Sequence, residues 1–145
     1  MQIHTNDGPI EILGFKRNEK IRAEVSKSYQ ADDEMDQLKM DAIMSIAKLM
    51  DDAFQYDSAE DWQAFSDQDG EKLKEIGQNL YSKGGMPLML RTVDELWTCI
   101  NLGIEKKVPG IKPLEHYEMC VKELDWIWNR IGNLEGEPIK DYWIC

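Results

Sequence analysis

The chain of 145 residues carries 28 acidic and 17 basic side chains, which gives a formal net charge of −11. Such a charge opposes binding to nucleic acid phosphates and favours basic partners, although simple solubility is the commonest reason for an acidic surface. A charged share of 31% and a hydrophobic share of 42% are typical of a folded globular protein and exclude a disordered chain.

Length, apolar runs and cysteines indicate one ordinary domain in a reducing compartment. At 145 residues the chain can bury its own core, so we expect a single domain, residues 1–145. No apolar run approaches the roughly 20 residues of a membrane span, and no basic-then-apolar leader opens the sequence. The cysteines, Cys99, Cys120 and Cys145, are odd in number and not closely spaced, which argues against a disulfide framework and predicts buried free thiols at Cys99 and Cys120. We therefore expect a cytoplasmic protein with no membrane partner.

The N-terminal part combines alternating segments with a basic stretch. Residues 1–15 alternate apolar and polar side chains around the turn-forming Asn6, Asp7 and Gly8, which predicts a small β-hairpin. Residues 16–27 hold five basic side chains and fit either a loop or a short helix.

Two helical segments are expected next. Residues 31–55 are apolar over so much of the helix circumference that we expect this helix at the centre of the core. Ser58 begins a capping-box-like start of a shorter helix that carries Trp62, and residues 66–70 should interrupt it.

Residues 71–97 read as a helix, a stop and a second helix. Leucine, isoleucine and tyrosine recur at helical spacing up to Gly84 and Gly85, where glycine can adopt the positive φ that closes a helix. Pro87 then fits the first turn of a new helix, because its missing N–H has no partner there in any case. The two helices should form a hairpin.

The last third predicts a loop, a helix and a tail. Residues 101–112 contain glycine and proline and should form the loop, Pro113 opens a helix that Gly132 ends, and residues 135–145 allow a terminal strand beside the N-terminal hairpin. The predicted fold is mainly α, a compact bundle of four to five helices with a small N-terminal β-hairpin and a C-terminal strand.

A resemblance supports this fold. The string IGQNLYSKGGMPLM, followed by LDWIWNRIG, resembles a pattern in small bacterial helical proteins without assigned activity, in which an IG-x2-LY-x2-GGM-x-LM core precedes a W-x-x-IG helix end. The shared residues are mostly packing and capping residues, so the resemblance implies a shared fold and no particular chemistry.

Motifs for catalysis or metal binding are weak. His116 and Cys120 are four residues apart on one helix, with Glu123 on the same side, but a structural zinc site generally needs four ligands. Residues 65–76 fail as a calcium loop because positions one and twelve lack carboxylates, and no nucleophile motif is present. We expect no cofactor and no enzymatic activity, with a metal-binding domain at His116 and Cys120 as one alternative.

Aromatic residues among charges are more informative. On the helix after Pro113, Met119 and Trp126 lie nearly opposite the buried stripe, so they either pack on the tail or form an exposed anchor. A second candidate anchor is Trp62, set among carboxylates that include Asp61, Asp67 and Asp69.

These features favour a small acidic protein that binds another protein. The reading that fits best is an immunity protein or inhibitor that neutralises a basic toxin or nuclease, with carboxylates in the positions of substrate phosphates. The alternatives are a structural or adaptor subunit, such as a homodimer that uses Met119 and Trp126, and the metal-binding domain. Nucleic acid binding is disfavoured by the charge, although residues 16–27 could form a local basic patch.

Overall fold

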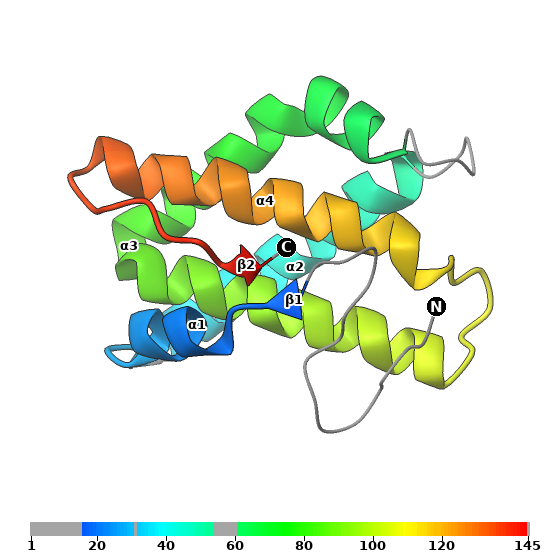
Figure 1. Ribbon diagram of the computed structural model, residues 1–145, viewed down its shortest axis with the longest axis horizontal. Coiled ribbons are helices and arrows are strands. Elements are labelled where there is room, and N and C mark those ends of the chain that lie inside the picture. Colours follow the sequence, from blue (N-terminus) through cyan, green and yellow to red (C-terminus); the bar gives the residue numbers. More distant parts are fainter. Residues whose placement is uncertain (1–15, 31, 54–60, 145) are drawn as a thin grey trace.

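The computed structural model describes residues 16–30, 32–53 and 61–144, with the side chains of all of these except 53 and 61–68. Within them the elements follow the order β1 (Lys16–Arg17), α1 (Glu19–Ser26), α2 (Asp33–Ala53), α3 (Asp61–Glu105), α4 (Leu114–Leu134) and β2 (Trp143–Ile144) (Figure 1). The mainly α fold class is therefore confirmed. The hairpin predicted in residues 1–15 lies outside the described residues.

The first two helices begin at side-chain caps. The carboxamide oxygen of Asn18 accepts a hydrogen bond from the backbone N–H of Ile21 at 3.3 Å, and a carboxylate oxygen of Asp32 accepts one from the N–H of Met35 at 2.7 Å. Each cap satisfies an N–H that has no partner within its helix. The basic stretch after residue 15 is thus largely a short helix.

Helix α3 contradicts the predicted interruption at residues 66–70. The helix continues through this polar stretch, and a Cβ at Gly70 would meet no atom of the described residues within 4 Å. A glycine in a helix costs only about 1 kcal/mol relative to alanine. Burial of Leu73 and Leu80 on the same helix can offset that cost, so packing overrides the local turn signal.

The predicted stop at the glycine pair is confirmed. Gly85 has φ 67° and ψ −163°, which divides α3 into a first arm, residues 61–84, and a second arm, residues 86–105. In Figure 1 the chain reverses at this point, and the second arm, in yellow-green, runs back across the molecule. The second arm extends to Glu105, so the predicted loop of residues 101–112 is shorter than expected.

Helix α4 packs against both arms of α3. The indole N–H of Trp128 donates to the carbonyl of Leu73 at 2.9 Å, and a Cβ at Gly77 would lie 2.5 Å from the Trp128 ring. On the second arm, Met86 lies against Gly132 at the far end of α4. The absence of a side chain at Gly77 therefore sets how closely the first arm approaches α4.

The core is centred on α3 and not on α2. Helix α3 packs against α1, α2 and α4, whereas α2 lies mainly against α3. Helix α2 buries one stripe that includes Ile46 and Met50 but leaves Met40 and Met44 at 48% and 68% exposure. The expectation of a central α2 is wrong, because an apolar side chain on the outer face is no evidence of burial.

A short ladder joins the two ends of the described chain. Strand β2 pairs antiparallel with β1, with Lys16 opposite Ile144 and Arg17 opposite Trp143. The predicted C-terminal strand is confirmed, and its partner is the residue pair just before α1. No helix of the described ranges combines the length and the apolar character needed to cross a bilayer.

Candidate functional site

The predicted patch around Trp62 is only partly described. Asp61, Trp62 and Asp67 belong to the first turns of α3, but their side chains lie outside the described residues. Asp69 is half-buried, and burial together with the nearby Asp52 raises the pKa of its carboxyl, while Lys72 acts in the opposite direction. A shared binding surface for these residues stays a prediction.

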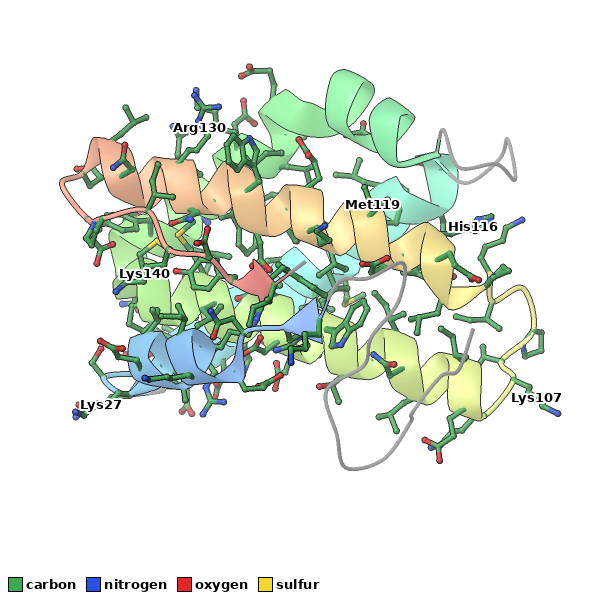
Figure 2. The ribbon with its side chains drawn as sticks, viewed as in Figure 1. Lys27, Lys107, His116, Met119, Arg130 and Lys140 are labelled. Carbon is green, nitrogen blue, oxygen red and sulfur yellow. The ribbon has the colours of Figure 1, made fainter. Side chains whose placement is uncertain are left out.

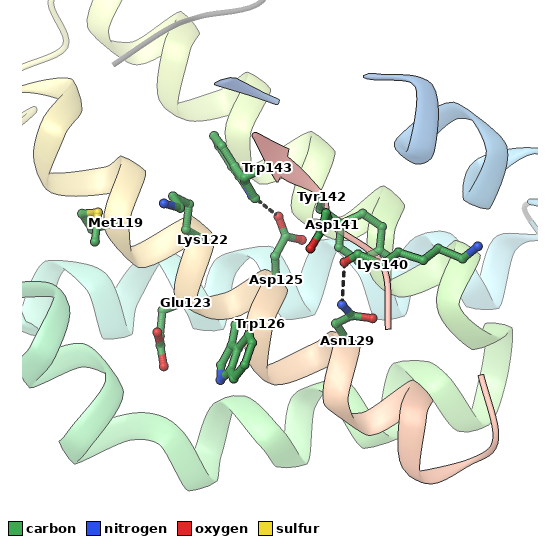
Figure 3. Close-up of a pocket in the computed structure, with 10 residues that line it drawn as sticks. All are labelled: Met119, Lys122, Glu123, Asp125, Trp126, Asn129, Lys140, Asp141, Tyr142 and Trp143. Carbon is green, nitrogen blue, oxygen red and sulfur yellow. Dashed lines mark hydrogen bonds between the residues drawn. The ribbon is translucent and has the colours of Figure 1, made fainter. Parts of the chain in front are cut away.

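The second predicted pair, Met119 and Trp126, lies in a groove of about 330 Å³. Helix α4 supplies the floor and one rim, and residues 140–143 supply the opposite rim (Figure 3). We call this the α4 groove. Its lining residues are Met119, Lys122, Glu123, Asp125, Trp126, Asn129, Lys140, Asp141, Tyr142 and Trp143.

Trp126 is the most exposed aromatic residue of the groove. Its side chain is 52% exposed, and the guanidinium of Arg130 lies 5.3 Å from its ring centre in a cation–π contact. Figure 2 shows Met119 and Arg130 toward opposite ends of α4. The helical spacing correctly predicted that Trp126 lies outside the core. Both alternatives for it, packing near the tail and an exposed anchor, hold in part, because Trp126 shares the groove with the tail and still faces solvent.

The rim opposite Trp126 is an extended segment fixed at two places. The side-chain N–H of Asn129 donates to the carbonyl of Lys140 at 2.7 Å, and the indole N–H of Trp143 donates to the carboxylate of Asp125 (Figure 3). Trp143 also packs edge-on against Trp97, with ring centres 5.3 Å apart. These contacts hold the segment at a defined distance from α4.

A buried ion cluster lies beneath this segment. Arg22 is 2% exposed and donates to Asp94 at 2.8 Å, to the carbonyl of Tyr142 at 3.1 Å and to Asp125. Burial lowers the pKa of Arg22, but the attraction of Asp125 and Asp94 exceeds that effect and raises it overall. Burial raises the pKa of Asp125, although Arg22 and the Trp143 N–H both stabilise its carboxylate.

This cluster reduces the possible basic patch of residues 16–27 to its exposed lysines, Lys16, Lys20 and Lys27. Arg22 is internal, and Arg17, whose side chain is 10% exposed, pairs with Asp94 and with Glu19. Two of the five basic residues of the N-terminal stretch therefore neutralise carboxylates within the protein. Sequence reasoning missed this because the partners are 72 and 103 residues distant for Arg22.

Glu118 is a second residue that sequence reasoning missed. It is 1% exposed, and both carboxylate oxygens are buried without a hydrogen-bond partner among the residues that the structure describes. Burial raises its pKa to about 7, with Glu115 adding to the shift and Lys122 opposing it. No sequence signal marks this position, because a glutamate beside a buried stripe is usually solvated.

The two weak metal-ligand candidates, His116 and Cys120, differ in their burial. Cys120 is fully buried in the core, whereas His116 is only half-buried. Within the described ranges no three side chains of histidine, cysteine, aspartate or glutamate are grouped so that they could hold a metal ion. Cys99 is exposed, which corrects the expectation that both it and Cys120 are buried.

The comparisons with known proteins add no family or activity. No family model, no curated protein and no solved structure matches the chain. The resemblance to small bacterial helical proteins stays a prediction.

Proposed function

We propose that this protein binds another protein, and that the α4 groove is its docking surface. The observation that carries this proposal is Trp126, half exposed at the rim and stacked by Arg130. Tryptophan, arginine and methionine are the residues enriched at protein interfaces, and partly exposed tryptophans beside a hollow often anchor a partner's side chain. Met119 extends this surface toward the start of α4.

The partner we propose is a basic protein. The net charge of −11 attracts a cationic surface over distances of about 10 Å at moderate salt, which speeds association. Within the groove, Glu123 and Asp141 stand beside Lys122 and Lys140, so the walls can pair with charges of either sign around an apolar centre. Overall charge would thus bring the partner in, and the Trp126 rim would hold it.

Inhibition of a basic toxin or nuclease is the specific form of this function that we propose. In that form carboxylates of this protein would occupy positions that phosphates take in the enzyme's substrate. Asp61, Asp67 and Asp69, near Trp62 on α3, would contribute to the steering field. Cys99 and Cys120 form no disulfide within the described residues, which fits a cytoplasmic site of action.

The test is capture of a partner with three matched baits. Wild type, Trp126→Ala and the control Leu134→Ala are used, since Leu134 is also on α4, is 77% exposed and lies outside the groove lining. The protein retained by wild type is identified, purified and titrated against each bait. We expect a basic protein whose affinity falls at least roughly 30-fold with Trp126→Ala and is unchanged with Leu134→Ala.

Salt and self-association give the remaining outcomes. Association with the wild type should slow as salt increases, because screening weakens long-range steering. An acidic partner, or equal affinity for wild type and Trp126→Ala, would overturn the proposal. Light scattering on the bait alone tests the homodimer alternative: a wild-type dimer that Trp126→Ala converts to a monomer would assign the groove to self-association instead.

A further inference from the structure

The two rims of the α4 groove differ in how they are built. The Trp126 rim is part of a helix whose other face is embedded in the core through Leu124 and Trp128. The opposite rim belongs to the segment that follows α4, residues 136–144, which is extended and ends in β2. The groove exists only while this segment lies over α4.

Residues 136–141 contribute little to the core, whereas Tyr142 belongs to it and Trp143 packs against it. Pro138 and Asp141 are exposed, and Ile139 and Ile144 are 52% and 40% exposed. Among the hydrophobic residues of the segment only Tyr142 is fully buried. Segments with few buried apolar contacts open locally at a lower free energy than the global unfolding of the protein.

The segment also has a natural pivot. Gly136 has φ 97°, a conformation that glycine adopts without strain, and a Cβ there would meet nothing within 4 Å. Beyond this pivot, polar contacts run from Asn129 to the Lys140 carbonyl, from Arg22 to the Tyr142 carbonyl and from Trp143 to Asp125. Asn18 adds a bond from its side chain to the Asp141 carbonyl and one from its backbone N–H to the Tyr142 carbonyl, and β2 pairs with β1. A segment held by such separate ties beyond a glycine describes a strap.

We infer that residues 136–144 form a releasable strap, and that seating of the strap forms the α4 groove while its release abolishes the groove. This inference concerns the regulation of the docking surface and rests on the proposed function for that role. A partner that binds only the seated form must shift the strap toward that form, and mutations that loosen the strap must weaken the partner by the same factor.

The test uses the full chain without any partner. Asn129→Ala removes the tie to the Lys140 carbonyl, and Asn79→Ala is the matched control, an exposed helical asparagine on α3. Amide hydrogen exchange is followed in both variants and in wild type. In wild type we expect amides of residues 139–144 to exchange faster than those of the α4 core, and Asn129→Ala should raise that exchange about five- to tenfold. Asn79→Ala should leave it unchanged.

A second measurement links the strap to the groove. The chain has five tryptophans, so incorporation of 5-fluorotryptophan gives one ¹⁹F resonance for each, assigned by single Trp→Phe variants. The resonances of Trp126 and Trp143, one on each rim, should report the same minor state, and Asn129→Ala should increase its population. The resonance of Trp128, 1% exposed in the core, should not report it.

Either of two results overturns the strap. The first is exchange of residues 139–144 at the rate of the slowest core amides, which would make the segment an integral part of the core. The second is an equal effect of Asn129→Ala and Asn79→Ala. Trp126→Ala should leave strap exchange unchanged, so a failed strap and a failed docking surface give different results.

Discussion

Glu118 offers the sharpest prediction about stability. Its carboxyl is buried with no hydrogen-bond partner in the described part of the chain, and its pKa is raised from 4.5 to about 7. Between these two pH values the folded state keeps a proton that the unfolded state has lost. The contribution of Glu118 to the stability of the wild type should therefore be greatest below pH 4.5, fall as the pH rises to about 7, and level off above that.

The size of the effect follows from the shift. One pKa unit corresponds to about 1.4 kcal/mol, so the full shift corresponds to roughly 3 kcal/mol. Relaxation of the surroundings and access of water reduce such penalties, and we expect about 1 to 3 kcal/mol at pH 8. Glu118→Gln, which is neutral at every pH, should stabilise the protein by this amount at pH 8 and have a much smaller effect at pH 5.

The assay is urea unfolding followed by circular dichroism at pH 5, 6, 7 and 8. Glu75→Gln, at an exposed position of α3, is the control and should not alter the pH dependence. Other titrating groups act equally on wild type and variant, so the difference between their unfolding free energies isolates Glu118. A difference that is the same at pH 5 and pH 8 would refute a buried, neutral carboxyl at this position.

Two further predictions concern packing and charge. Asp125→Ala should lower the free energy of unfolding by about 3 to 5 kcal/mol, because it leaves the buried Arg22 without its most buried partner; an effect below 1 kcal/mol in urea unfolding would contradict this role. Gly77→Ala should destabilise by about 1 to 3 kcal/mol, since its Cβ would lie 2.5 Å from the Trp128 ring. Gly70→Ala, where no described atom lies within 4 Å of the added Cβ, should instead stabilise by up to about 1 kcal/mol. Equal shifts in melting temperature for the two glycine variants would refute the packing argument.

Local signals predicted the parts of the fold that depend on local chemistry. The stop at Gly85 follows from the conformational freedom of glycine followed by Pro87, and the buried stripe of α4 follows from helical spacing. The interruption at residues 66–70 was wrong for a related reason. Turn-forming residues disfavour a helix by only about 1 kcal/mol each, and the free energy gained by burying one face of a continuous helix exceeds that cost.

Only one of the two rims of the candidate site could be predicted from the sequence. The position of Trp126 outside the buried stripe could be derived from the spacing along one helix, whereas the opposite rim comes from a segment seated by Arg22, 120 residues earlier than Tyr142. A pattern along one helix contains no information about which distant segment will cover it. The groove could therefore be found only in the structure. The exposure of Trp126, its most exposed aromatic residue, could be predicted from the sequence.

The internal ion cluster changes where charges lie on the protein but not the net charge. Arg17 and Arg22 pair with Asp94 and Asp125, so equal numbers of positive and negative charges are withdrawn from the surface and the net charge of −11 is unaffected. The possible basic patch in residues 16–27 depends on where its basic residues lie, and it is reduced to the exposed Lys16, Lys20 and Lys27. Steering of a basic partner depends chiefly on the total charge, so the proposed charge complementarity is unaffected by the pairing that withdraws the two arginines.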